Sequence, residues 1–231
     1  MNDSVSYRSE DGIAIVTIDR ADKLNALNED VIQGLKSAWI RLEASDDRVA
    51  VLHAAGDRAF SVGADIKSPP AEMWEGVPSV GVAVSKPVIA AVHGWCIGGA
   101  YVIVQMCDLV VASESTVFKY PEAQLGFTGG LIASAVARIP HKIAMEFMLL
   151  GQDLSAQRAY EVGMVNRVVP KGEELAAAME YAAILRHSVN QSPAEAGAIS
   201  RERLLTVRTS EDGAEGRRAF AEKRTPDFKG R

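Results

Sequence analysis

Three stretches of the chain repeat one pattern, in which a short run rich in Val, Ile and Ala leads into a turn and then into a helical or glycine-bearing segment. The runs are GIAIVTID (12–19), RVAVLHAAG (48–56) and KPVIAAVHG (86–94). Each is bounded by Gly, Pro, Asp or a charged residue, which is typical of short buried strands. The runs recur at a spacing of roughly forty residues, which predicts an α/β fold built as a spiral of stacked units.

Helical periodicity follows the first run and returns after residue 130. Asn28 is suited to cap a helix, and the acidic residues Glu29 and Asp30 complement the dipole of its first turn. The later part of the chain predicts a helix ending at Gly151, one capped by Ser155, one over about 173–189, and one from Pro193 to about Val207.

Composition and charge exclude some classes of function. The 231 residues carry a formal net charge of −5, which argues against a nucleic-acid surface. No apolar stretch reaches the ~20 residues that a membrane-spanning helix needs. The N-terminus, MNDSVSYRSEDG, lacks the basic and then apolar pattern of a secretory signal. We therefore expect no membrane partner and a cytoplasmic location.

The two cysteines, Cys96 and Cys107, are not expected to form a disulfide. A largely helical segment between them would separate them by roughly 15 Å at ~1.5 Å per residue. A disulfide requires Cα atoms within about 7 Å. No motif places a base beside Cys96, so a nucleophilic role is not favoured either.

Two small-residue turns are the first candidates for chemistry. In GWCIGGAYVIVQMCD (94–108), Gly98 and Gly99 precede an apolar helical run, where backbone N–H groups stay free and favour an anion. In AFSVGADIKS (59–68), Ala64 follows a glycine after another predicted strand. Two such turns can each offer one N–H to a single oxygen, as in an oxyanion hole. The alternative is that the glycines only allow a helix to pack closely on a strand.

The chain resembles the crotonase, or enoyl-CoA hydratase/isomerase, superfamily in a set of motifs that follow the family order over nearly its whole length. The motifs are IDRADKLNALN, RAFSVGADIKS, KPVIAAVHGWCIGGA, YPEAQLGF, LLGQDLSAQRAYEVGMVNRVVP and AFAEKRTPDFKGR. The resemblance implies a crotonase-type spiral of ββα units over residues 1–172 and a C-terminal helical oligomerisation region over 173–231. It also implies a homotrimer or a dimer of trimers, an acyl-CoA thioester substrate, and no metal or other cofactor.

The resemblance also assigns roles to single residues. Ala64 and Gly99 match the oxyanion-hole donors that hold a thioester enolate, and Glu122 matches a catalytic acid–base. Positions that match CoA-binding residues are Ala26, Arg58, Asp65, Ile66, Lys67, Phe220 and Lys223. From its residue type alone, Asp65 is better suited to hold its turn than to carry a proton. The alternative for Glu122 is a solvated acidic residue after a proline.

One expected carboxylate is missing. Hydratases of the two-glutamate type carry a glutamate three residues after the second oxyanion glycine, and this chain has Val102 there. Hydration divides its proton transfers between an acid and a base, whereas a 1,3-proton shift needs only one group. Hydration and double-bond isomerisation of an enoyl-CoA both stay open. So do decarboxylation, retro-aldol cleavage and thioester hydrolysis on the same scaffold, and a catalytically weak acyl-CoA-binding protein.

Two segments depart from the family pattern and leave the acyl preference open. Residues 68–85 are short and rich in Pro and Gly, so that Glu72, Trp74 and Glu75 either enter the pocket or belong to a mobile loop. The turn after Glu122, LGFTGGLIAS, is also shorter than usual. The remaining candidates are interpreted as structural: His93 at a strand end, and Tyr101 and Tyr120 as core residues, with substrate orientation as their second possible role.

Overall fold

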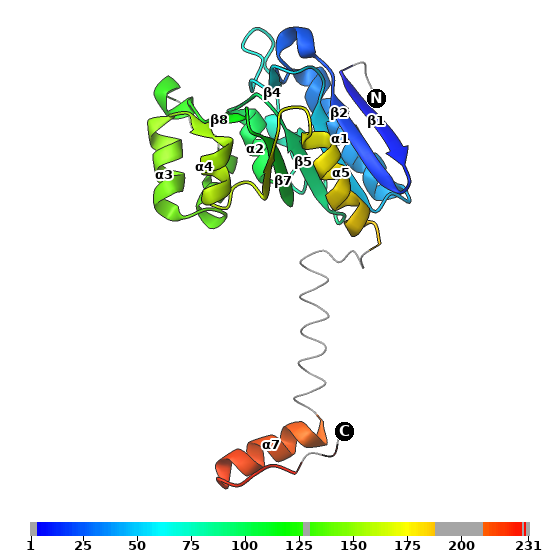
Figure 1. The fold of residues 1–231 in the computed structure, drawn as a ribbon, viewed down its shortest axis with the longest axis vertical. Helices are drawn as coiled ribbons and strands as arrows, with labels where there is room; N and C mark the ends of the chain where they lie inside the picture. The colour runs from blue at the N-terminus through cyan, green and yellow to red at the C-terminus, as the bar shows by residue number, and fades with distance from the viewer. Residues whose placement is uncertain (1–3, 127–129, 188–209, 228, 230–231) are drawn as a thin grey trace. The chain divides into compact units, whose positions relative to one another are not determined.

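Six strands form one sheet and four shorter strands form a second (Figure 1). The larger sheet has the order β1 (Val5–Glu10), β2 (Ile13–Ile18), β3 (Val49–Ala54), β5 (Val88–Val92), β7 (Leu109–Ser113) and β10 (Arg167–Val169). The smaller has the order β4 (Ala59–Ser61), β6 (Trp95–Ile97), β8 (Val117–Lys119) and β9 (Leu154–Ser155). The computed structural model describes residues 4–126, 130–187, 210–227 and 229.

Successive strand pairs divide between the two sheets. β3, β5 and β7 add to the large sheet in parallel, and the strands that follow them, β4, β6 and β8, add to the small sheet in parallel. A helical element follows each pair: η2 (Met73–Gly76), α2 (Gly99–Gln105) and η3 (Glu122–Leu125). This arrangement confirms the predicted α/β spiral of ββα units.

The predicted helix ends at Asn28, Gly151 and Ser155 are confirmed, whereas the helix predicted over about 173–189 already ends at Leu185. The side chain of Asn28 accepts a hydrogen bond from the Val31 N–H and begins α1 (Glu29–Ala44). Gly151, at φ +58°, ends α3 (His141–Leu150) after the 3-10 helix η4 (Gly130–Ala137). Ser155 caps α4 (Ala156–Glu161) by accepting from the Arg158 N–H. The helix predicted from Pro193 to Val207 lies outside the described residues.

Both faces of the large sheet are buried. Alternate side chains along its central strands point to opposite sides, and each side packs against helices. Leu52 of β3 belongs to a cluster with residues of α1 and α2, whereas its neighbour Val51 packs with Ala178 of α5 (Glu174–Leu185). Residues Met1–Asn190 form one compact unit and Gln191–Arg231 a second. The division at 172/173, before α5, is the one that the family pattern implies, and it stays a prediction.

The short segment between β4 and β5 is anchored on α1. The indole N–H of buried Trp39 donates to the Gly76 carbonyl at 2.8 Å. Glu75 accepts from Gln33 and lies 3.0 Å from the Lys36 ammonium. These contacts fix η2 against α1. The surface formed by η2 is called the η2 wall below.

In the second unit, α7 (Glu211–Ala221) is followed by a short segment that folds back onto it. The Arg224 guanidinium donates two hydrogen bonds to Glu215, and the Asp227 N–H donates a third. Phe220 is 87% exposed on this helix, and Lys223 adopts φ +52° after it.

Two further predictions can be compared with the structure. Cys96 and Cys107 are both free and buried, as expected, and burial raises the pKa of each thiol. Within the described part of the chain, no helix is long and apolar enough to cross a membrane.

Candidate active site

A cavity of about 410 Å³ opens where the turns after β4 and β6 meet the η2 wall. Most of its lining is apolar. The lining residues are Ala64, Pro69, Pro70, Ala71, Met73, Trp74, Gly99, Val102, Glu122, Gly130 and Leu131. Ala64, Gly99 and Glu122, which lie far apart in the chain, are thus brought to one cavity.

The Ala64 turn is held by the backbone of Leu27. The Leu27 N–H donates to the Gly63 carbonyl at 2.8 Å, and the Asp65 N–H donates to the Leu27 carbonyl at 2.9 Å. These two hydrogen bonds involve the residues on either side of Ala64, and neither of them uses the N–H of Ala64 itself. Among the described residues, the N–H groups of Ala64 and Gly99 donate to no backbone carbonyl.

The two turns are in contact with each other. A Cβ atom added at Gly63, where φ is +86°, would lie 2.7 Å from the Ile97 carbonyl oxygen and 3.5 Å from the Gly99 nitrogen. Only glycine permits this approach, because any larger residue would displace one turn from the other. Close packing of the two turns and two N–H groups without a backbone acceptor among the described residues therefore occur together.

Glu122 is the first residue of η3 and lies half-buried against the Gly98 turn. Its Oε2 atom is buried and has no hydrogen-bond partner among the described residues, and burial raises the pKa of the carboxyl. Gly98 has φ +57°, and a Cβ atom there would overlap Glu122 Oε1. A desolvated carboxylate with one oxygen left without a partner is well suited to exchange a proton with a ligand.

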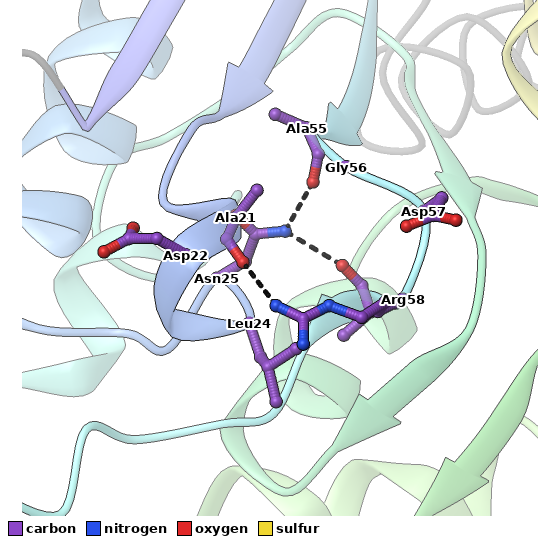
Figure 2. Close-up of a pocket in the computed structure, with 9 residues that line it drawn as sticks. Ala21, Asp22, Leu24, Asn25, Ala55, Gly56, Asp57 and Arg58 are labelled. Atoms are coloured by element: carbon purple, nitrogen blue, oxygen red, sulfur yellow. Dashed lines mark hydrogen bonds between the residues drawn. The ribbon is translucent and has the colours of Figure 1, made fainter.

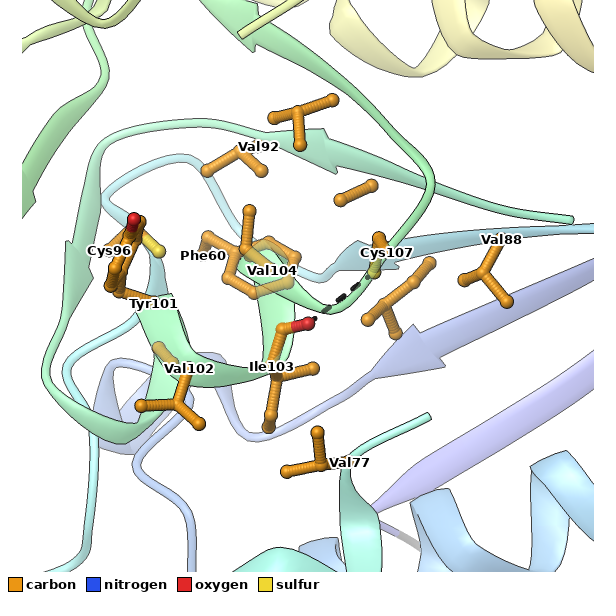
Figure 3. Close-up of a cluster of buried hydrophobic side chains, with 14 of the residues drawn as sticks. Phe60, Val77, Val88, Val92, Cys96, Tyr101, Val102, Ile103, Val104 and Cys107 are labelled. Carbon is orange, nitrogen blue, oxygen red and sulfur yellow. Dashed lines mark hydrogen bonds between the residues drawn. The ribbon is translucent and has the colours of Figure 1, made fainter. Parts of the chain in front are cut away.

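Val102 lies on α2 at the position of the missing carboxylate. It is 6% exposed and belongs to the apolar cluster around α2 (Figure 3), while its side chain also lines the cavity. Among the described lining residues, Glu122 is the one ionisable side chain.

The short 68–85 segment contributes apolar groups to the cavity and no carboxylate. Trp74 lines the cavity and donates its indole N–H to Glu72, while Glu75 faces α1. The proposed entry of Trp74 is confirmed, whereas Glu72 and Glu75 are not among the lining residues. Sequence reasoning missed Met73, whose Sδ lies 3.3 Å from the position of a Cβ at Gly99. The one signal in the sequence that pointed toward Met73 was that residues 68–85 depart from the family pattern.

Arg58 lines a second cavity, of about 280 Å³ (Figure 2). Its guanidinium donates to the Ala21 carbonyl at 3.3 Å. Buried Asn25 donates to the carbonyls of Ala55 and Ala59, which joins the segment after β2 to the loop after β3. Arg58 therefore lies beside the Ala21–Asn25 turn and outside the lining of the first cavity.

The other predicted CoA-binding residues of the first unit surround the Ala64 turn. Asp65 accepts from the N–H groups of Lys67 and Ser68, and it forms an ion pair with Arg20 at 3.1 Å. The hydrogen bond from Arg20 is the main reason that the pKa of Asp65 is lowered. Asp65 thus holds its turn, as its residue type indicated.

Ala26 and Ile66 differ sharply in exposure. Ala26 is buried and presents its carbonyl to Arg20, whereas Ile66 is 94% exposed next to the exposed Lys67. Phe220 and Lys223 belong to the second compact unit, so their predicted contact with the same ligand stays a prediction.

The side chains interpreted as structural have core environments. His93 is 4% exposed, its Nδ1 lies 3.6 Å from Glu174 Oε1, and burial lowers its pKa. Tyr101 packs edge-on against Phe118 and Phe147, and Tyr120 also packs against Phe147. None of these three lines the first cavity. No group of three or more metal-ligating side chains occurs among the residues described.

Comparison with known proteins decides the family. The family model for enoyl-CoA hydratase/isomerase matches residues 8–231. The chain belongs to the enoyl-CoA hydratase/isomerase family. It is 32% identical to an (E)-benzylidenesuccinyl-CoA hydratase of Thauera aromatica, over 98% of this chain and 99% of that protein. It is 34% identical to the enoyl-CoA hydratase EchA19 of Mycobacterium tuberculosis, over 94% and 93%.

A solved structure of an enoyl-CoA hydratase from Mycobacterium tuberculosis has the same fold. It superposes with a TM-score of 0.78 at 32% identity, and the match covers 100% of both chains. The crotonase-type architecture and membership of an enzyme family are therefore established for this chain. Membership of the family predicted from the sequence motifs is confirmed.

Proposed function

We propose that this enzyme processes an enoyl-CoA thioester by proton transfer through one carboxylate, that of Glu122. The observation that carries the proposal is that Glu122 is the one ionisable side chain among the described residues of a cavity that also contains the Ala64 and Gly99 turns. The N–H groups of Ala64 and Gly99 donate hydrogen bonds to the thioester carbonyl oxygen and stabilise the enolate that forms on it. Each such donor is worth roughly 2.7–4 kcal/mol in the transition state.

The favoured reaction is the shift of a double bond along the acyl chain. Glu122 removes a proton from C2 of a 3-enoyl-CoA, the enolate is held at the oxyanion hole, and the same carboxyl returns the proton to C4. The bond from C2 to C3 becomes double as the bond from C3 to C4 becomes single. The raised pKa of Glu122 makes its carboxylate a stronger base for the first half, and the acid formed there returns the proton in the second half.

Hydration is the second candidate. The relatives described above are named as hydratases, which favours addition of water to a 2-enoyl-CoA. Val102 and Met73 oppose it, because neither side chain can hold or activate a water molecule beside Glu122. The cavity lining therefore favours isomerisation over the reaction in the relatives' names.

The CoA portion follows the surface outside the cavity in this proposal. Ala26, Asp65, Ile66 and Lys67, next to the Ala64 turn, would contact the CoA portion, and the cation of Arg58 would meet its phosphates beside the second cavity. Phe220 and Lys223 contribute from the C-terminal unit of the same or a neighbouring copy, in a homotrimer or a dimer of trimers. The mechanism needs no cofactor other than the CoA of the substrate.

The direct test is to incubate the protein with 3-hexenoyl-CoA and follow the product by mass spectrometry and ultraviolet absorbance. We expect a conjugated 2-enoyl product of unchanged mass. A product heavier by one water would favour hydration. Absence of any conversion, with binding of the thioester retained, would favour the other enolate reactions or a binding protein.

A further inference from the structure

Arg20 makes a bridge that no part of the proposed reaction uses. Its guanidinium donates to the Ala26 carbonyl at 2.6 Å and to Asp65 Oδ2 at 3.1 Å through the same nitrogen. Both side chains of the ion pair are largely buried, at 19% exposure for Arg20 and 15% for Asp65. The two acceptors lie on the two strands of chain that pair at Leu27 and Ala64.

The turn that carries Arg20 is itself rigidly anchored. The Arg20 N–H donates to the side chain of Asn25, and the Asn25 N–H donates back to the Arg20 carbonyl. Buried Asn25 joins this turn to Ala55 and Ala59. Leu24 and Asn25 both adopt positive φ, at +52° and +54°. Such strain in consecutive non-glycine residues persists only where surrounding contacts impose it.

On the far side of the bridge, Asp65 uses its other oxygen to organise the chain after Ala64. Oδ1 accepts from the Lys67 and Ser68 N–H groups while Oδ2 faces Arg20. The position of Ala64 thus depends on two sets of contacts. The backbone of Leu27 bonds to its neighbours Gly63 and Asp65, and the side chain of Asp65 pairs with Arg20. Loss of the ion pair would remove the side-chain contact that ties Asp65, the residue after the proposed donor, to the Arg20 turn.

We infer that Arg20 is a positioning residue that orients the Ala64 N–H toward the thioester carbonyl through Asp65 and Ala26. The inference rests on the proposed function, since it assumes that this N–H binds the carbonyl oxygen. Arg20 is not among the described residues that line the cavity, so it acts through the residues it holds. Its effect is geometric: a displacement of the donor by a fraction of an ångström weakens a hydrogen bond that forms only when its direction is correct.

The test uses Arg20→Gln and measures both turnover of 3-hexenoyl-CoA and the carbonyl stretch of bound hexanoyl-CoA labelled with carbon-13 at C1. The infrared band reports the hydrogen bonds to the thioester carbonyl without requiring turnover. We expect R20Q to lower kcat roughly 10- to 100-fold with little change in KM, and to move the band toward its position in free solution. R20K, which keeps the cation, should recover part of the loss.

Two further variants distinguish positioning from general stability. R167Q breaks an ion pair with Glu180, remote from the cavity, and should leave both the band and kcat at the wild-type values. D65N should resemble R20Q, and the double variant R20Q/D65N should be no worse than the more impaired single variant, because both changes remove one interaction.

Three results would overturn the inference. One is an unchanged carbonyl band in R20Q. Another is a loss of activity that R167Q shares, and the third is a rise in KM with unchanged kcat, since each indicates a role that is structural or limited to binding. If wild-type protein shifts the carbonyl band but converts no 3-hexenoyl-CoA, the band still tests Arg20 while the proposed reaction fails. If wild-type protein does not shift the band at all, the oxyanion hole and the role of Arg20 are both wrong.

Discussion

Two carboxylates lie beside the turns that border the cavity, but their electrostatics are opposite. Asp65 beside Ala64 accepts hydrogen bonds from Arg20, Lys67 and Ser68, and its pKa is lowered. Glu122 beside Gly98 is desolvated, its Oε2 has no partner among the described residues, and its pKa is raised. Environment therefore separates a carboxylate that holds structure from one that is suited to carry a proton.

The contrast between the two carboxylates is tested most directly by a substitution of Glu122. We expect Glu122→Gln to lower kcat for 3-hexenoyl-CoA roughly a thousandfold, because the amide keeps the shape but cannot exchange the proton. Steady-state kinetics would measure the loss, and a dissociation constant for hexanoyl-CoA near the wild-type value would show an intact site. E161Q, on the exposed face of α4, is the matched control and should retain full activity. Comparable turnover in E122Q and wild type would remove Glu122 from the mechanism.

The Gly98 turn tests whether the position of Glu122 matters as much as its charge. Gly98→Ala introduces a Cβ that overlaps Glu122 Oε1, and we expect kcat to fall roughly a hundredfold. Gly163→Ala is the matched control: Gly163 also has positive φ, but a Cβ there meets nothing within 4 Å. Both variants should lose about 1–2 kcal/mol of the free energy of unfolding through backbone strain. Equal activity losses in the two variants, measured beside their thermal denaturation, would attribute the effect to strain alone.

The pKa of Glu122 is raised and that of Asp65 is lowered, and this difference predicts how kcat/KM changes at acid pH. Glu122 must be ionised to remove a proton, so kcat/KM should rise with pH and reach half its plateau above ~4.3, the ordinary pKa of a glutamate. Asp65, with its lowered pKa, stays ionised throughout that range and should not contribute. The measurement is kcat/KM from acid to neutral pH. A midpoint below the ordinary value would contradict the desolvation of Glu122.

The smallest expected effect is on stability. The pKa of Glu122 is raised in the folded state, so the ionised carboxylate at neutral pH lowers the free energy of unfolding. The protonated carboxyl, present at lower pH, does not carry this penalty. E122Q removes this penalty and should raise Tm by roughly 2 °C at pH 7. Removal of an ion-paired carboxylate in D65N should lower Tm under the same conditions. Calorimetry of both variants would show whether the two changes have opposite signs.

Local patterns in the sequence predicted much of the fold. The β-branched runs formed strands, Asn28 and Ser155 capped helices, and Gly151 ended one, because these signals act within a few residues. The resemblance to a family brought Ala64, Gly99 and Glu122 to attention, and the structure places all three at one cavity. Their chemical roles remain predictions.

What the sequence did not predict depends on contacts between distant segments. The Arg20–Asp65 ion pair joins residues 45 positions apart, and Gln33 and Glu75 are separated by 42. No periodicity records such pairs, because neither partner alters the pattern of its own element. The position of Met73 over Gly99 follows in turn from the anchoring of η2 on α1. These contacts set the apolar character of the cavity, which is why the acyl preference could not be inferred from motifs.

The central claim is that one carboxylate carries the proton from C2 to C4. The measurement that tests it most directly is the conversion of 3-hexenoyl-CoA deuterated at C2, with the position of the label in the product found by NMR. The account predicts 2-hexenoyl-CoA with deuterium at C4, because the buried carboxyl of Glu122 returns what it removed. A product with only solvent hydrogen at C4, or a hydrated product, would contradict it.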